Sequence, residues 1–178
     1  MNPETHESQL LKRLAVAMTE SPRSTIKELA EAVGISKATL HRFCGTRENL
    51  ELMLIEASRK SLDHIIDVAE KDFDDYQAGL RELIQAHYQN REYHVFSSSN
   101  QACMTDDYWF AYLKAIDAFF LKGQKKGTFR LEFGVSFLSE SFISILCGII
   151  DAERRGRIAS MGAEVMIENL FLTGALEQ

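Results

Sequence analysis

Four side chains that can donate hydrogen bonds to DNA lie close together near the amino end of this 178-residue sequence. They are Lys37, Thr39, His41 and Arg42, and they fall in a short segment, residues 36–43, that we expect to be helical. Lysine and arginine bind phosphates and base edges, and a helix of this size fits the major groove. The first hypothesis is therefore recognition of DNA.

The segment that must position these side chains is an amphipathic helix over residues 25–33, followed by a turn at Gly34. Its apolar residues recur at i, i+3, i+4 and i+7 and form one stripe, made by Ile26, Leu29, Ala30 and Val33. Thr25 and Glu28 have the types and spacing of a capping box, and Ser36 is the expected cap of the second helix. Gly34 suits a left-handed helix end. Together these features predict a helix-turn-helix.

An ordinary helical hairpin is the alternative interpretation, because glycine turns between amphipathic helices are common. Three details favour the helix-turn-helix: the two caps, the small Ala30 where the helices cross, and the polar, basic exposed side of the second helix. Leu40 and Phe43 of that helix are expected to point inward. Thr46 can cap a third helix that begins at Arg47.

The same run resembles the DNA-binding domain of the tetracycline-repressor (TetR) family, whose pattern is approximately T-x-x-x-I-A-x-x-A-G-V-S-x-G-T-L-Y-x-Y-F-x-x-K-E-x-L. The corresponding residues are Thr25, Leu29-Ala30, Val33-Gly34-Ile35-Ser36, Thr39-Leu40-His41, Phe43-Cys44, Arg47-Glu48 and Leu50. The motif covers about residues 8–60. His41 and Cys44 depart from the pattern, because the family usually has Tyr and Phe at these positions.

The resemblance implies a role for each matching residue. Lys37 and Ala38 would face base edges, Thr39 and His41 would approach phosphates, and Arg47, where the family usually has Lys, would meet a phosphate. Thr25 would approach a phosphate from the preceding helix. The residues that we assign to DNA binding are Thr25, Ser36, Lys37, Ala38, Thr39, His41, Arg42 and Arg47.

The charge distribution is compatible with DNA binding although the net charge is −6. Residues 1–47 contain seven Lys/Arg and five Glu, a balance of +2, so the remaining residues carry −8. An acidic body with a mildly basic head orients a protein on DNA. No signal segment or run of about 20 apolar residues is evident, so we expect a cytoplasmic protein. The three cysteines at 44, 103 and 147 are odd in number and far apart, which argues against a disulfide framework.

The remaining pattern predicts an all-α protein. A helix over residues 7–20 completes the three-helix head, and a helix without Gly or Pro runs from Arg47 to about Glu70. Further helices are expected over residues 76–90, 91–103 (with a break at 97–100), 108–122, 134–155 and 160–175, with a turn over 123–127. We divide the chain into a helix-turn-helix DNA-binding domain, 1–47, and a helical effector-binding and dimerisation domain, 48–178.

Aromatic and semi-polar residues concentrate between positions 87 and 120, and apolar walls with a few polar groups are what a small-molecule pocket needs. A plain hydrophobic core is the alternative for any single residue. The family resemblance places an effector cavity here, and we expect a hydrophobic or aromatic effector. The candidate effector-binding residues are His87, Tyr88, Tyr93, Phe96, Trp109, Phe110, Tyr112 and Phe119.

The last two expected helices carry more apolar surface than one small domain can cover. One has a stripe of small residues beside its apolar one, and the other is apolar on more than one side. We therefore predict a two-fold dimer through a four-helix bundle, against the alternative of a buried monomer core. The candidate interface residues are Ser141, Ser144, Ile145, Gly148, Met166, Leu170 and Phe171.

These observations favour a TetR-like repressor that binds a palindromic operator as a dimer and is released by an effector. An enzyme is disfavoured, because no nucleophile-elbow, P-loop, dinucleotide or zinc-protease motif occurs, and no cofactor or metal is expected. The alternatives are a redox-responsive regulator using Cys44, a metal-responsive one using His87 and His94 with Cys103 conceivable as a further ligand, a regulator without an effector, and a scaffold dimer.

Overall fold

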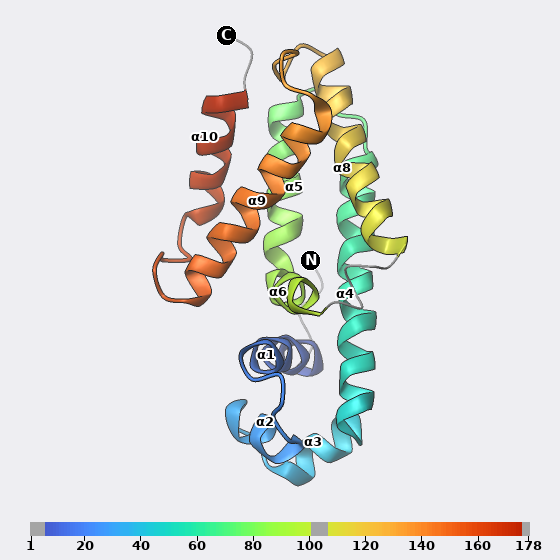
Figure 1. Cartoon of the computed structure of the whole chain (residues 1–178), viewed down its shortest axis with the longest axis vertical. Coiled ribbons are helices and arrows are strands. Elements are labelled where there is room, and N and C mark those ends of the chain that lie inside the picture. Colours follow the sequence, from blue (N-terminus) through green and yellow to red (C-terminus); the bar gives the residue numbers. More distant parts are fainter. Residues whose placement is uncertain (1–5, 101–106, 176–178) are drawn as a thin grey trace. The chain divides into compact units, whose positions relative to one another are not determined.

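The computed structural model describes residues 6–100 and 107–175, and every regular element in these ranges is a helix (Figure 1). The prediction of an all-α fold is confirmed. The elements are α1 (His6–Glu20), α2 (Ile26–Ala32), α3 (Lys37–Cys44), α4 (Arg47–Glu70), α5 (Tyr76–Gln89), α6 (Arg91–Ser99), α8 (Asp107–Lys125), α9 (Val135–Arg154) and α10 (Ala163–Ala175).

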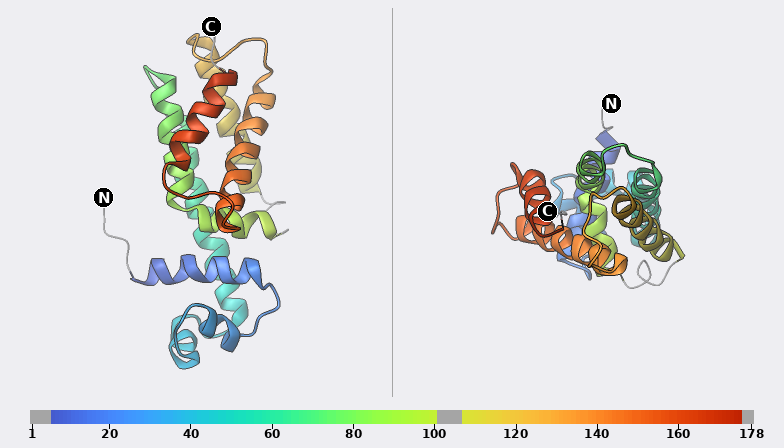
Figure 2. Two further views of the ribbon diagram at one scale, coloured as in Figure 1. Left: turned by 90° about the vertical axis from the view of Figure 1, so that its left-hand side faces the viewer. Right: turned by 90° about the horizontal axis from the view of Figure 1, so that it is seen from above.

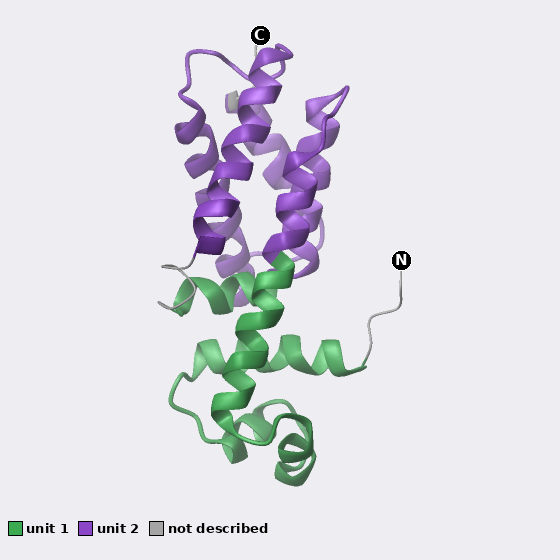
Figure 3. Ribbon diagram, turned by 90° about the vertical axis from the view of Figure 1, so that its right-hand side faces the viewer, with its two compact units in different colours: residues 1–61, 92–105 green, residues 62–91, 106–178 purple. Residues whose placement is uncertain are grey.

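The chain forms two compact units (Figure 3). Unit 1 comprises residues 1–61 and 92–105, and unit 2 comprises residues 62–91 and 106–178. The division therefore falls inside α4, whereas the sequence pattern placed a boundary after residue 47. The physical reason is that Leu50 and Leu54 of α4 are fully buried in the core of unit 1.

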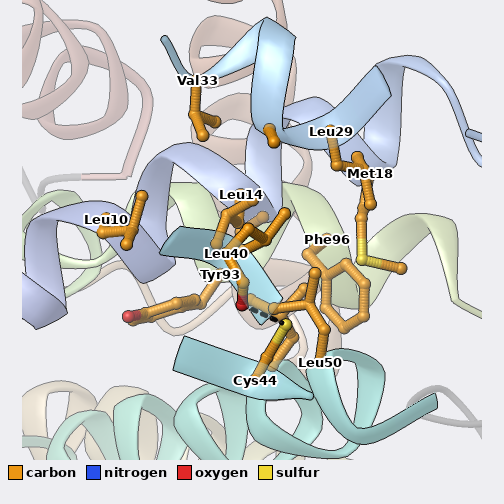
Figure 4. Close-up of a cluster of buried hydrophobic side chains, with 13 residues drawn as sticks. Leu10, Leu14, Met18, Leu29, Val33, Leu40, Cys44, Leu50, Tyr93 and Phe96 are labelled. Atoms are coloured by element: carbon orange, nitrogen blue, oxygen red, sulfur yellow. Dashed lines mark hydrogen bonds between the residues drawn. The ribbon is translucent and has the colours of Figure 1, made fainter. Parts of the chain in front are cut away.

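The core of unit 1 is mainly aliphatic, with two aromatic residues that come from α6 (Figure 4). Helices α1, α2, α3 and the first half of α4 contribute the leucines, and α6 adds Tyr93 and Phe96 to the same cluster. The serines of α6 do not break the helix at residue 97. The helix continues to Ser99, and each serine hydroxyl is satisfied within it by donating to a carbonyl three or four residues earlier. The predicted extension of this helix over 101–103 lies outside the described residues.

The core of unit 2 is strongly aromatic. Helix α8 packs against α9, and α10 packs against both α5 and α9, as the views in Figure 2 also show. Phe120 has ring centroids of Phe129, Phe142 and Phe171 within 5.1–5.8 Å. These edge-on and tilted ring pairs are geometries that aromatic side chains favour.

The turn predicted over residues 123–127 is partly wrong, because α8 continues through Gly123 to Lys125. A Cβ at Gly123 would lie 2.4 Å from the ring of Phe129, so glycine is needed here for close packing. Gly79 in α5 has the same function, since its Cβ would lie 2.8 Å from Phe73. The turn itself comes at Gly127, where φ is +73°.

By length and composition alone, helix α9 is long and apolar enough to cross a membrane, a feature that was not predicted from the sequence. Its apolar residues lie in two stripes. One stripe is buried in unit 2 and the other, which includes Phe137, is exposed. The core helix of a soluble protein can be equally long and apolar, so length and composition alone are weak support for a membrane span.

Candidate nucleic-acid interface

The helix that precedes the recognition segment begins with the predicted capping box. The Glu28 amide donates to Thr25 Oγ1 at 3.3 Å, and the Thr25 amide donates to a Glu28 carboxylate oxygen at 2.7 Å. The hydrogen bond from the Thr25 backbone is also the main cause that lowers the pKa of Glu28. Two residues only three positions apart in the sequence therefore fix where α2 starts.

The turn after α2 has the predicted left-handed glycine, with φ of +70° at Gly34. The Ile35 amide donates to the Ala30 carbonyl at 2.9 Å, which closes the turn. Arg13 of α1 adds a hydrogen bond from its guanidinium to the Val33 carbonyl oxygen. The end of α2 is thus tied to α1, and the direction in which α3 leaves the turn is set.

Helix α3 begins at Lys37 with Ser36 as its cap. Ser36 Oγ accepts from the Thr39 amide at 3.1 Å and lies 2.9 Å from the Thr39 hydroxyl. Leu40 is fully buried, which fixes the inner side of this short helix. Ser36, like Thr25, is a predicted DNA-binding residue that the structure uses as a helix cap.

The outer side of α3 carries four of the predicted DNA-binding residues in exposed positions: Lys37, Ala38, His41 and Arg42. Thr39 is half-buried. Within residues 6–100 and 107–175, neither Lys37 nor Arg42 has a hydrogen-bond or ion-pair partner. The structure therefore brings basic groups, a small residue and an imidazole onto one accessible surface, whose donors are free to bind phosphate and base edges.

Arg47 is placed differently from the expectation of a phosphate contact. Its Nε donates to the Ser24 carbonyl at 3.2 Å and its Nη2 to the Pro22 carbonyl at 2.5 Å. Its Nη1 lies 3.5 Å from a carboxylate oxygen of Glu51. The guanidinium thus holds the loop between α1 and α2, a contact across more than 20 residues that local sequence patterns do not reveal.

Cys44 lies in the core of unit 1, and its thiol donates to the Leu40 carbonyl at 3.3 Å (Figure 4). Burial raises the pKa of this thiol. Because the thiolate is the reactive form of cysteine, these surroundings disfavour oxidation or metal binding at neutral pH. The redox alternative through Cys44 therefore gains no support from its environment.

The eight predicted effector-binding residues do not form one group. Tyr93 and Phe96 belong to the core of unit 1, because α6 packs there, and the other six belong to unit 2. Phe110 is 65% exposed, since it lies on the outer side of α8. Phe119 is fully buried between aromatic neighbours at ring-centroid distances of 5.3–6.0 Å. Tyr88 is also buried, and its hydroxyl donates to Glu153 at 2.8 Å.

The remaining candidates form a small polar cluster in unit 2. His87 Nδ1 lies 2.7 Å from the Leu83 carbonyl and Nε2 lies 2.9 Å from the Tyr112 hydroxyl, and Trp109 stacks on the ring of Tyr112 at 5.1 Å. Full burial lowers the pKa of His87 to about 4, so the imidazole is neutral at pH 7.

The metal alternative gains no support from His87, because both ring nitrogens of this residue already have partners within unit 2. In the part of the chain that the structure describes, no group of three or more His, Cys, Asp or Glu side chains is arranged to hold a metal ion. Cys103, the conceivable further ligand, lies outside the described residues.

The predicted interface residues are mostly exposed in the single chain. Met166 is 63% and Leu170 60% exposed, Ser144 and Gly148 are exposed, and Ser141 and Ile145 are half-buried. Phe171 is the exception: it is 4% exposed and its ring contacts Phe120 and Phe142, so it is a core residue of unit 2.

An apolar groove on unit 2 continues this exposed face. It has a volume of 180 Å³ and runs between α9 and α10, and its lining includes Ser141, Ile145 and Leu170 together with Phe137. Phe137 is 61% exposed and was missed by the sequence analysis. Its position four residues before Ser141, on the same helical face, was the signal that could have identified it.

The sequence matches no protein-family model. It is 44% identical over 177 residues to the HTH-type transcriptional regulator NfxB of Pseudomonas aeruginosa, covering 96% of this chain and 95% of the relative. Its fold is similar to that of MbdR from Azoarcus sp. CIB (TM-score 0.71, 16% identity, 96% of this chain and 100% of that one). It is also similar to the TetR-family regulator PfmR of Thermus thermophilus (0.64, 22%, 98% and 98%) and to the TetR-like LfrR of Mycobacterium smegmatis in complex with proflavine (0.60, 15%, 97% and 97%).

Proposed function

This chain belongs to the TetR-like helix-turn-helix transcriptional regulators, and from this premise we propose that it is a repressor that binds a palindromic operator as a dimer and is released by a small-molecule effector. The observation that carries the proposal is the exposed side of α3. Lys37 and Arg42 have no partner within the described residues, on a helix whose start and inner side are fixed by Ser36 and Leu40. A fixed helix with free donors is what major-groove recognition requires.

The dimer is supported by the exposed apolar face of unit 2. Met166 and Leu170 of α10 lie exposed beside the groove lined by Phe137 and Ile145 of α9. The exposed Gly148 leaves space for a second helix to approach closely. A second copy that placed its own α9 and α10 here would form a four-helix bundle. Two-fold symmetry of the heads then makes the operator a palindrome.

The part of the proposal that concerns an effector rests on the aromatic character of unit 2, where Trp109 stacks on Tyr112 beside the buried His87. Such a combination of aromatic rings and few polar groups suits a hydrophobic or aromatic small molecule. The structural relative LfrR, which is a different protein, was crystallised in complex with the small molecule proflavine. Release requires that the effector bind more tightly to the form with low DNA affinity. A regulator with no effector is the alternative.

The proposal places the protein in the cytoplasm, where its operator is, and gives it no catalytic activity. Blocking the promoter by occupancy is then the mechanism of repression, and it needs only binding. The polypeptide contributes the recognition surface of α3, the symmetry of the dimer and the linkage between effector and DNA.

The decisive experiment is to incubate the purified chain with fragmented genomic DNA and to sequence the fragments that it retains. We expect enrichment of one palindromic sequence, with discrimination among its variants reduced about tenfold or more in Lys37→Ala if this lysine reads a base. Candidate effectors are then titrated against the complex. A strictly monomeric protein that retains no fragment would refute the proposal.

A further inference from the structure

The loop between α1 and α2, residues 21–24, leads directly into the capping box of α2. Its Ser24 amide donates to the Ser21 carbonyl at 3.1 Å. The carbonyls of Pro22 and Ser24 accept from Arg47 at 2.5 and 3.2 Å. The first residue after this loop is Thr25, the predicted phosphate-binding residue. The position of Thr25 therefore depends on a side chain that comes from the start of α4.

All three nitrogens of the Arg47 guanidinium have partners. Nε and Nη2 bind the two loop carbonyls, and Nη1 lies 3.5 Å from Glu51, one turn further along α4. The guanidinium is a rigid planar fork, so binding a phosphate with two parallel hydrogen bonds would require it to leave at least one of these partners. A lysine could neutralise a phosphate equally well, but its ammonium is not a planar fork that matches the two carbonyls and the carboxylate together.

Glu51 extends this set of contacts to the end of α6. The Asn100 side-chain amide donates to Glu51 Oε1 at 3.4 Å, and Asn100 directly follows α6 in the chain. Arg47, Glu51 and Asn100 also line one depression of 240 Å³ on unit 1, together with Phe96. The loop before α2 is thus connected through two side chains of α4 to the end of α6.

We propose that Arg47 is a positioning residue for operator binding rather than a phosphate contact. It holds residues 21–24 in place, with Glu51 orienting its guanidinium, so that Thr25 and the start of α2 meet the DNA in a fixed position. This inference rests on the proposed DNA-binding function and adds to it that Arg42 and Arg47 have different roles. Arg42 on α3 is free for DNA, and Arg47 is committed to the protein.

The salt dependence of DNA binding separates these two roles. The slope of log K against log salt is negative, and each phosphate contact that is lost reduces its magnitude by about 0.9. We expect Arg47→Gln to weaken operator binding about tenfold at every salt concentration, with the slope unchanged. Arg42→Gln is the matched control and should reduce the magnitude of the slope by about 0.9, the amount expected for one lost phosphate contact. Circular dichroism of each variant checks that it is folded.

Two further variants test the role of the fork. Arg47→Lys keeps the charge, so a phosphate contact predicts near-wild-type binding, whereas the positioning role predicts that most of the loss remains. Glu51→Gln removes a negative charge and would strengthen binding if charge alone mattered. The positioning role predicts weaker binding instead, because the guanidinium loses the carboxylate that orients it. A fall in slope for Arg47→Gln with full recovery in Arg47→Lys would overturn the inference.

A measurement without DNA keeps this inference distinct from the proposed function. Amide hydrogen exchange of the free protein should become at least fivefold faster at Ser24 and Thr25 in Arg47→Gln, while Arg42→Gln leaves these amides unchanged. Unchanged exchange in Arg47→Gln would refute the positioning role even if the operator is found. Failure of the wild-type chain to bind any DNA would refute the proposed function and leave the exchange result to decide the role of Arg47 in the loop.

Discussion

The two units of this protein differ in the side chains that they leave on their surfaces. Among the described residues, the large hydrophobic side chains that remain exposed belong to unit 2, with the single exception of Leu52. Unit 1 instead exposes the basic and polar side of α3. A surface of hydrogen-bond donors is complementary to DNA, and an apolar one is complementary to another apolar surface. The comparison therefore supports the proposal of a different class of partner for each unit.

The largest expected effect comes from placing a charge on the apolar face of unit 2. In Leu170→Glu, two unpaired carboxylates would be buried at the proposed two-fold interface, which should cost about 4 kcal/mol or more, a thousandfold in dimer affinity. Sedimentation equilibrium measures the change. The control is Leu52→Glu, which alters the similarly exposed leucine of unit 1 and should leave the dimer intact. Equal effects of both variants would contradict the comparison.

The second effect concerns acid and the buried imidazole of unit 2. His87 has a pKa of about 4 in the folded protein against 6.5 for the free side chain, so between these pH values only the unfolded chain takes up the proton. The contribution of the neutral imidazole to the free energy of unfolding is therefore fully present above pH 6.5. It is lost as the pH drops toward 4, which should lower the free energy of unfolding by about 3 kcal/mol. Denaturant unfolding at both pH values measures it.

The pH effect has a matched control on the same chain. His87→Gln should lack the additional loss of stability between pH 6.5 and 4, whereas the variant of an exposed histidine, His64→Gln, should retain it. Carboxylates such as Glu28 contribute their own loss on acidification in every variant. A wild-type pH dependence in His87→Gln would show that the imidazole is not the group responsible.

A third effect tests the close packing of the aromatic core. In Gly123→Ala the new methyl group would lie 2.4 Å from the Phe129 ring, so the ring must shift, and unit 2 should lose about 2 kcal/mol of stability. Gly134→Ala is the control, because no heavy atom lies within 4 Å of its Cβ position. Thermal unfolding compares the two variants, and a Gly123→Ala protein as stable as the control would show that the ring moves at no cost.

The smallest effect concerns the capping box of unit 1. Thr25→Ala removes the oxygen that accepts from the Glu28 amide and should destabilise unit 1 by about 1 kcal/mol. Thr25→Ser keeps the cap and serves as the control. Hydrogen exchange of α2 measures the local change, and faster exchange confined to unit 2 would contradict the assignment.

The sequence predicted unit 1 better than unit 2 because its signals are short-range. The capping box, the left-handed Gly34 and the Ser36 cap each depend on residues within four positions of one another. In unit 2, the glycine at position 123 predicts a turn, but it lies inside α8, where a Cβ would meet the ring of Phe129 six residues further along. Local rules cannot distinguish these cases.

The candidate site divides along the same line. The exposed side of α3 follows from helical periodicity, and the structure places Lys37 and Arg42 as expected. The contacts of Arg47 with a loop more than 20 residues away, and the packing of Tyr93 and Phe96 in unit 1, depend on how helices assemble. Neither could be obtained from spacing along the chain.

Unit 1 is built from two separate stretches of chain, and this limits how it can be transplanted. A fragment that ends at residue 61 would lack Tyr93 and Phe96, so the leucines around them would face water and the fragment would be prone to aggregate. A chimeric protein that joins unit 1 to a different effector-binding domain must therefore retain α6. A chimera that keeps only the helix-turn-helix would lack part of the core of unit 1.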